Sequence, residues 1–152
     1  MLYVTTRDRS HPCTTQQILL KKRSTDGGFY IPFKMPSFSQ EDIDSLAEKS
    51  FGQCVAEILN LLFDTDLSGW DIDFCIGRYP VRLELLNSRI ILGEAWHNPD
   101  WDYARSVRNL TKLICQNNTD PGDWIKIGIR IAMLFGTYGQ LLRHGIQLSD
   151  IA

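Results

Sequence analysis

The feature that most restricts the fold is a pair of helix starts in the first half of the chain. Ser39 precedes Asp42 by three residues, and Ser50 precedes Gln53 in the same way. At this spacing the two side chains can each bond a free backbone N–H of the first helical turn. Apolar residues then recur at helical spacing: Ile43, Leu46 and Ala47 after the first start, and Phe51, Cys54, Val55, Ile58, Leu61 and Leu62 after the second. The pattern predicts two short helices in series.

Two β-type segments precede these helices. Residues 2–6 alternate and are rich in strand-forming side chains, which predicts a strand. Residues 26–28 read Asp-Gly-Gly, which is typical of a tight turn because glycine accepts positive φ. Residues 29–32 predict a second short strand that Pro32 ends.

The second half of the chain predicts a hairpin and two helices. Residues 81–86 and 89–92 flank Asn87 and Ser88, which favours a β-hairpin. A helical stripe follows at Tyr103, Val107, Leu110 and Ile114. Residues 125–131 alternate like a strand, but a longer helical stripe covers them: Trp124, Ile127, Ile131, Leu134, Phe135, Tyr138 and Leu142.

The longer stripe favours a helix over residues 122–144, with Asp120 and Pro121 as its start and Gly145 as its stop. We expect this closing helix to be the most buried element. The fold class is therefore α+β: a small N-terminal sheet with two short helices, a central β-hairpin, and two C-terminal helices packed over it.

Composition excludes some classes of partner. The 152 residues suit one domain, or one with a small appendage, and 43% hydrophobic residues can form a core. A net charge of −2 gives no electrostatic reason to expect nucleic acid or an anionic membrane as a partner. The longest apolar stretch contains Lys126 and Arg130 and is too short to span a bilayer.

Charged residues begin at Arg7, too early for the apolar region of a secretion signal, so we expect a cytoplasmic protein. The four cysteines are far apart and show no zinc spacing, so we expect free thiols and no metal site.

Three stretches, taken in order, resemble threonine synthase. Residues 3–7 and 26–32 are similar to the opening of that family, a Tyr-x-Ser-Thr-Arg strand followed by Asp-Gly-Gly-Leu-Tyr-Val-Pro. Residues 91–99 resemble its strand ending in Glu-Leu-Phe-His-Gly-Pro-Thr. Residues 123–131 resemble its Asn-Trp-Ala-Arg helix, which lies near the substrate phosphate. The resemblance implies a threonine-synthase-like N-terminal domain at 1–80 and a remnant of the cofactor domain at 81–152, together forming one compact unit.

The departures from the family concern its chemistry. The family places a Phe-Lys-Asp shortly after His-Gly-Pro-Thr, and that lysine forms the Schiff base with pyridoxal phosphate. Here the ungapped position is Ala104, and no lysine occurs between Lys49 and Lys112. Only 106–122 separate the second and third motifs, so the family's glycine-rich phosphate loop has no equivalent. The resemblance therefore implies a degenerate relative that needs no cofactor and has lost threonine synthase catalysis.

Several polar residues are candidates for a retained site. His97, after a predicted strand and near Glu94, is a weak catalytic candidate; the alternative is a structural histidine bonded to a backbone carbonyl. Arg7, His97, Lys126 and Arg130 are candidates for binding a small anion. The alternative for the two helix cations is that they are solvated or paired with Asp123 and Glu94, and an acid at 123 disfavours a phosphate.

The aromatic residues of the C-terminal half suggest a different role. In the family, several equivalents pack against the cofactor domain, so its loss leaves apolar surface that must be covered: Trp96, Trp101, Tyr103, Trp124, Phe135 and Tyr138. Three hypotheses follow, in order of preference: association as a homodimer or accessory subunit, binding of a small phosphate or amino-acid ligand, and an enzyme with new chemistry at His97 and Glu94.

Overall fold

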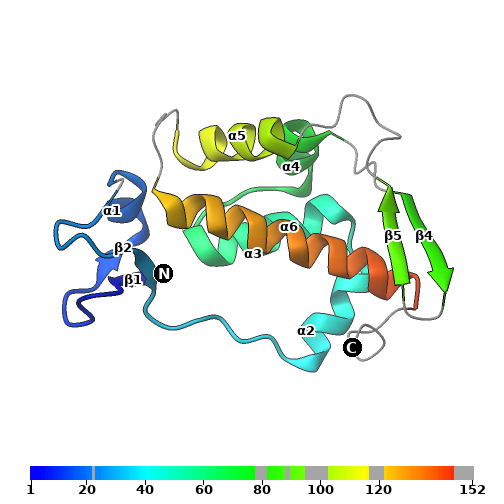
Figure 1. The fold of residues 1–152 in the computed structure, drawn as a ribbon, viewed down its shortest axis with the longest axis horizontal. Helices are drawn as coiled ribbons and strands as arrows, with labels where there is room; N and C mark the ends of the chain where they lie inside the picture. Colours follow the sequence, from blue (N-terminus) through cyan, green and yellow to red (C-terminus); the bar gives the residue numbers. More distant parts are fainter. Residues whose placement is uncertain (22, 78–81, 88–89, 95–102, 117–121, 146–152) are drawn as a thin grey trace.

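The computed structural model describes the chain except residues 22, 78–81, 88–89, 95–102, 117–121 and 146–152. A small sheet with its helix lies at one end of the molecule, the hairpin lies at the other, and longer helices fill the space between them (Figure 1). The elements are β1 (Leu2–Thr5), β2 (Cys13–Thr14), α1 (Thr15–Leu19), β3 (Tyr30–Pro32), α2 (Gln40–Ser45), the 3-10 turn η1 (Leu46–Glu48), α3 (Phe51–Phe63), α4 (Gly69–Ile76), β4 (Arg82–Asn87), β5 (Ile90–Glu94), α5 (Tyr103–Ile114) and α6 (Asp123–Arg143). The predicted α+β class is confirmed.

The N-terminal sheet has the antiparallel order β2-β1-β3. Tyr3 lies opposite Pro32, and Val4 lies opposite Ile31. Proline is tolerated here because β3 is an edge strand. Tyr3 and Val4 are fully buried, so the sheet packs its central strand against the helices. Both strands predicted in this region are confirmed.

The two predicted helix starts are confirmed as complete capping boxes. Ser39 and Asp42 open α2, and Ser50 and Gln53 open α3. In each box the N-cap side chain accepts from a backbone N–H and the first-turn side chain accepts from the N-cap N–H. Nine of the 13 residues of α3 are buried, so this helix forms the centre of the core.

Two further helices begin with the same motif and were not predicted. Thr14 and Gln17 form a capping box at the start of α1, and Ser68 and Asp71 form one at the start of α4. Residues 64–68 form a loop after α3, and α4 begins directly after it at Gly69. Both helices are short, so neither carries enough turns to give a periodic apolar stripe.

The predicted hairpin is confirmed as an antiparallel pair, β4 and β5, with an irregularity in register between Leu85 and Asn87. The Asn87 side chain accepts from the backbone N–H of Ile90 at 3.0 Å, which closes the turn on the β5 side. Within the described sheets the hairpin has no third strand.

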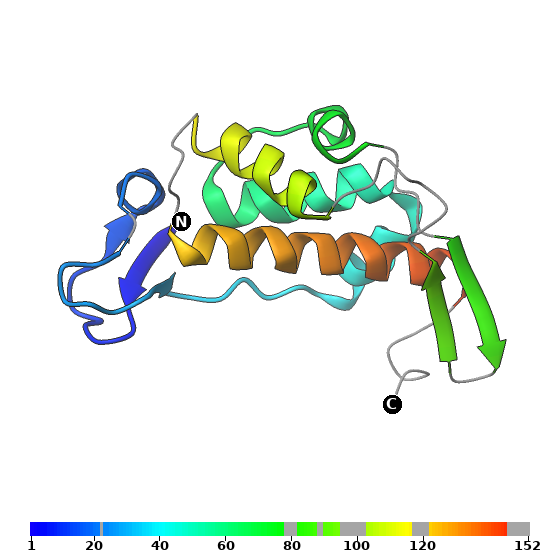
Figure 2. The same ribbon diagram turned by 45° about the horizontal axis from the view of Figure 1, so that its top comes forward.

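The closing helix, α6, runs along most of the length of the molecule beside α3 (Figures 1 and 2). Small residues let the two backbones approach: a Cβ added to Gly136 would lie 2.8 Å from the Phe51 ring, and one added to Gly139 would lie 2.9 Å from the Leu46 carbonyl oxygen. The prediction of a helix is confirmed.

The expectation that α6 would be the most buried element is wrong. Seven of its 21 residues are buried, a smaller share than in α3. The reason is its position: α6 buries one face against α3, α5 and η1, whereas the shorter α3 packs against both α6 and α4. None of the seven large residues of the predicted stripe is fully buried. The buried face is instead Ile125, Gly128, Ile129, Ala132, Met133, Gly136 and Gly139.

Candidate functional site

Arg7 lies beside the turn that joins α1 to β3. Its guanidinium donates to the Asp26 carbonyl oxygen at 3.0 Å. The Asp26 carboxylate accepts from the Thr5 hydroxyl at 2.5 Å and from the Gly28 backbone N–H at 2.7 Å. These hydrogen bonds lower the pKa of Asp26, the Thr5 hydroxyl most of all. Gly27 has φ 73°, so the turn is structural as predicted, and Arg7 stabilises it.

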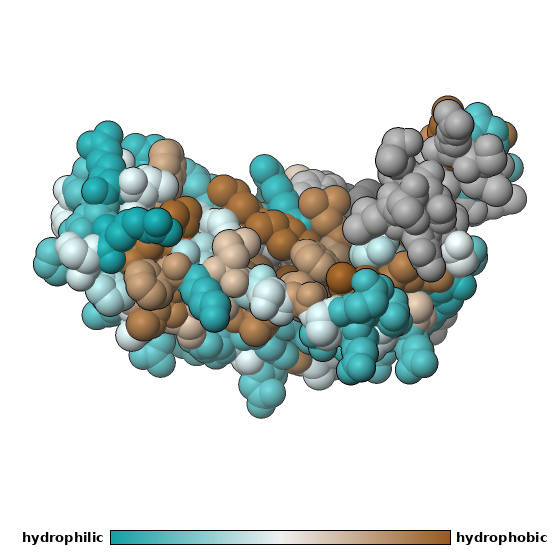
Figure 3. All heavy atoms as spheres, turned by 90° about the horizontal axis from the view of Figure 1, so that it is seen from below, coloured by the Kyte–Doolittle hydropathy of each residue, from teal (hydrophilic) through white to brown (hydrophobic). Residues whose placement is uncertain are grey.

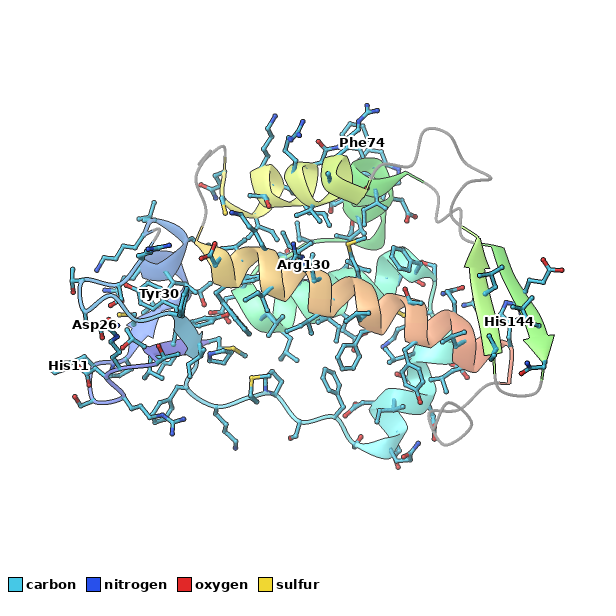
Figure 4. All side chains as sticks on the ribbon, in the orientation of Figure 1. His11, Asp26, Tyr30, Phe74, Arg130 and His144 are labelled. Atoms are coloured by element: carbon cyan, nitrogen blue, oxygen red, sulfur yellow. The ribbon has the colours of Figure 1, made fainter. Side chains whose placement is uncertain are left out.

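Lys126 and Arg130 lie one turn apart on α6, and both are exposed. The Lys126 ammonium lies 3.8 Å from the Asp123 carboxylate, a weak surface pair of the kind that the alternative interpretation anticipated. Arg130 lies part-way along α6, whereas Asp26, to which Arg7 binds, lies at the far end of the N-terminal sheet (Figure 4). The structure therefore brings Lys126 and Arg130 together on one helix, with Arg7 elsewhere.

The other polar candidates cannot be placed in the same way. His97 lies outside the described residues. Glu94 is the last residue of β5, opposite Arg82 in the hairpin register. A catalytic role for His97 and Glu94 stays a prediction. Among the described residues, no group of three or more histidine, cysteine or acidic side chains is placed to hold a metal ion.

Ala104, which the sequence resemblance predicted to stand in place of the family's lysine, lies in the first turn of α5 and is exposed. The rest of this helix is anchored to the core. Leu110 is fully buried, and the Asn109 side-chain amide donates to the Cys75 carbonyl oxygen at 3.0 Å. The helix therefore has a fixed position, and the methyl group of Ala104 is exposed at its start.

A small cavity of about 10 Å³ lies where the start of α6 meets the N-terminal sheet. Lys21 and Arg23 line it together with Gly122 and Asp123. Gly122 caps α6 without a side-chain hydrogen bond, and helix N-termini attract anions. The sequence did not point to this site, because Lys21 and Gly122 are about a hundred residues apart. Its volume is enough for about one water molecule.

The side of α6 away from α3 is apolar. We call Ile127, Ile131, Leu134 and Tyr138 the outer face; these positions recur at three- and four-residue spacing and so share one side of the helix. Leu134 is 69% exposed and Ile127 is 42% exposed. A band of apolar residues crosses the middle of the molecule when it is seen from below (Figure 3). Lys126 and Arg130 flank the outer face.

The four cysteines are free, as expected, and burial raises the pKa of the Cys54, Cys75 and Cys115 thiols, the last to about 11. Thiols of this kind are poor nucleophiles. None of the described helices has both the length and the apolar character needed to cross a membrane.

The family model described as "Threonine synthase N terminus" matches residues 2–78, just over half of the chain. The chain belongs to the threonine synthase family. The match covers the N-terminal sheet and α1 to α4, the part in which the opening motifs and both predicted helices lie. No curated protein sequence matches the chain.

A solved structure, pyridoxal-phosphate-bound threonine synthase from Brucella melitensis, has a similar fold. The TM-score is 0.59 at 20% sequence identity, and the match covers 76% of this chain. That share exceeds the part matched by the family model, so the likeness in fold extends beyond residue 78. The chain spans only 28% of the length of the Brucella protein.

Proposed function

We propose that this chain is a non-catalytic threonine-synthase-like protein that acts through protein association, as a homodimer or as an accessory subunit of another protein. The observation that carries the proposal is the outer face of α6, where Ile127 and Leu134 are exposed on a helix whose other face is packed on α3. Exposed apolar surface on an ordered helix is typical of an interaction site.

The short segment between the second and third family motifs supports the same proposal. Only residues 106–122 separate them, where the resemblance implies most of a cofactor domain. Surfaces that such a segment would cover must instead face solvent or a partner. Lys126 and Arg130 are exposed beside the outer face, so we expect the partner surface to be apolar with acidic residues at its edge.

Loss of catalysis is supported by the residues that would have to hold pyridoxal phosphate, which do not fit that cofactor. Ala104 has no amine to form the imine. The cavity lined by Lys21 measures about 10 Å³, far below the roughly 300 Å³ of a ligand pocket, and no lysine is among the described residues that line the two larger hollows between α1 and α5. Lys49 is already paired with Glu57. We propose that the protein requires no cofactor, and that it resides in the cytoplasm.

Sedimentation velocity at micromolar concentration tests the association. The wild-type protein should form a dimer, or should bind a partner when it is isolated from its native cell extract. Leu134→Asp should weaken either association by about tenfold or more, because a charge would be desolvated at the interface. Leu20→Asp is the matched control, since Leu20 is 79% exposed, against 69% for Leu134, but follows α1 as its C-cap. A wild-type protein that is strictly monomeric and retains no partner would refute the proposal.

An absorbance titration with pyridoxal phosphate, followed by borohydride trapping and peptide mapping, tests the loss of cofactor chemistry. We expect no imine band, or only diffuse labelling of surface lysines. A band with one labelled lysine, such as Lys112 or Lys126, would show that the chemistry has moved to a new residue. Conversion of O-phosphohomoserine to threonine would contradict the proposal outright.

A second candidate function is binding of a small phosphate or amino-acid ligand. The observation that favours it is the placement of Lys21 and Arg23 beside the start of α6, where the N-cap Gly122 makes no side-chain hydrogen bond. Asp123 in the same cavity weakens it by repulsion. Thermal shift with phosphoserine and phosphohomoserine tests it: stabilisation that Arg23→Gln abolishes would favour a ligand site, and no shift at high concentration would exclude it.

A further inference from the structure

A groove separate from the outer face of α6 lies between α1 and the C-terminal end of α5. Two adjoining hollows of about 250 Å³ and 560 Å³ share Gln16 and Leu19 on one wall and Ile114 and Gln116 on the other. The loop after α3, residues 64–67, closes one end of the larger hollow. Figure 2 shows α1 and the C-terminal end of α5 at the same end of the molecule. The larger hollow is within the volume range of small-molecule sites.

The groove lies where two helices end. Asp64 follows α3 and has φ 49°, and Gln116 follows shortly after α5 and has φ 48°. These are the two non-glycine residues with positive φ in the described chain, and both line the groove. Each helix C-terminus carries a partial negative charge from its last carbonyl groups. Both helix ends therefore make the groove electronegative.

The ionisable side chains reinforce that potential. The Asp66 carboxylate lines the groove, is exposed and has no partner among the described residues. The neighbouring Asp64 carboxylate already holds an ammonium group, the α-amine of Met1, and also accepts from the Thr15 hydroxyl at 2.7 Å. No lysine, arginine or histidine is among the described residues that line either hollow.

The walls supply apolar contact. Leu19 and Ile114 lie in both hollows, on opposite walls. Leu113 adds an apolar side chain that is 37% exposed, beside the acidic end of the groove. A ligand that fits must therefore combine a hydrocarbon stem with a positively charged end. A bare cation would leave the apolar walls exposed to water, and a neutral apolar molecule would leave the negative charge of Asp66 without a partner.

We propose that this groove binds an aliphatic ammonium group, with its hydrocarbon stem between Leu19 and Leu113 and its charge at Asp66. A free alkylamine and the lysine side chain of a peptide share this chemistry. The site does not depend on association through the outer face of α6, since no residue of α6 lines the groove.

Titrations followed by ¹H–¹⁵N NMR test the site, with 1-aminohexane and a blocked lysine amide as probes and hexanoate as the anionic control. Both amines should shift the amide signals of Leu19, Asp66 and Gln116 with millimolar affinity, and hexanoate should not. Asp66→Asn should weaken amine binding about three- to fivefold, as expected for an exposed ion pair. Asp44→Asn removes an exposed aspartate on α2 and should leave the affinity unchanged.

Three outcomes would overturn the proposal: no shift with either amine, equal binding of hexanoate, or equal weakening by Asp66→Asn and Asp44→Asn. If only the blocked lysine amide binds, the natural ligand is a peptide; if 1-aminohexane binds better, it is a free amine. Leu19→Ala should weaken 1-aminohexane but leave methylamine unaffected, which separates the hydrocarbon contact from the charge.

Discussion

The two faces of α6 differ in what they contribute. The inner face is built from small and branched residues pressed against α3, with Ile129 fully buried and Gly128 against the Phe63 ring. The outer face carries larger side chains, yet Ile127 and Leu134 are exposed. Residue size therefore does not indicate which side of this helix is the core: close approach of the backbones selects small residues for the inner face, and larger ones are left for another surface.

The largest effect should come from Ile129→Ala on the inner face. Removing three buried carbons beside α3 leaves a cavity, so we expect the free energy of unfolding to fall by about 3–4 kcal/mol. Urea unfolding followed by far-UV circular dichroism measures it. If the free energy of unfolding fell by less than about 1 kcal/mol, the inner face would not be tightly packed in solution.

Gly128→Val should have the next largest effect. A Cβ at this position would lie 2.4 Å from the ring of Phe63, which is itself buried. We expect a loss of about 2–3 kcal/mol from overpacking. The double variant Gly128→Val with Phe63→Leu is the control, since it should lose less than the sum of its two single changes. Additive losses would mean that the two side chains do not meet.

Tyr3→Phe tests whether the N-terminal sheet and the helices form one unit. The Tyr3 hydroxyl donates to the carbonyl oxygen of Leu62 in the last turn of α3, where carbonyl groups lack helical partners. Burial raises the pKa of Tyr3 to about 12, so the hydroxyl remains a donor at neutral pH. Losing this bond should cost about 1–2 kcal/mol.

If the chain is one compact unit, Tyr3→Phe should shift the circular dichroism and tryptophan fluorescence transitions equally. Tyr30→Phe serves as the control, because the Tyr30 hydroxyl has no hydrogen bond among the described residues. Separate transitions for the two probes would instead favour two units that meet near residue 80.

Asp26→Asn should have a smaller effect, and one that depends on pH. Hydrogen bonds from Thr5 and Gly28 lower the pKa of Asp26 in the folded protein. A lowered pKa stabilises the fold above the unfolded value of about 3.9, and this stabilisation is lost as the pH falls through the folded pKa. The variant should therefore be less stable than the wild type at pH 7, and the difference should shrink below pH 4. If the difference in free energy of unfolding between the wild type and Asp26→Asn did not change with pH, the pKa of Asp26 would not be lowered in the folded protein.

Sequence patterns predicted the parts of the fold that depend on local chemistry. The capping boxes at Ser39 and Ser50, the turn at Gly27 and the hairpin at Asn87 each act over a few residues, and each is confirmed. The start of α1 at Thr14 carried the same capping signal, but without a periodic stripe it was not recognised.

What depends on distant contacts was not predictable in this way. The buried face of α6 depends on how closely Gly136 approaches Phe51, and periodicity alone ranks large residues above glycine. The cavity lined by Lys21 exists only because α6 begins beside the N-terminal sheet. Among the candidate residues, the role of Arg7 in the Asp26 turn required the structure, whereas the absence of a lysine at Ala104 was evident from the sequence alone.

The smallest effect on the folded monomer should come from Ile127→Ala. This variant makes the same substitution as Ile129→Ala, at a position two residues earlier on the same helix. Ile127 is 42% exposed, and alanine is the better helix former, so we expect a change within about 0.5 kcal/mol at dilute concentration. Association adds a second term, because a partner that binds only the folded state stabilises it by mass action. The wild-type melting temperature should therefore rise with protein concentration if the chain dimerises, and the variant's should rise less. Equal concentration dependence in the two proteins would place the interface elsewhere, and a loss as large as that of Ile129→Ala would mean that the outer face is part of the core.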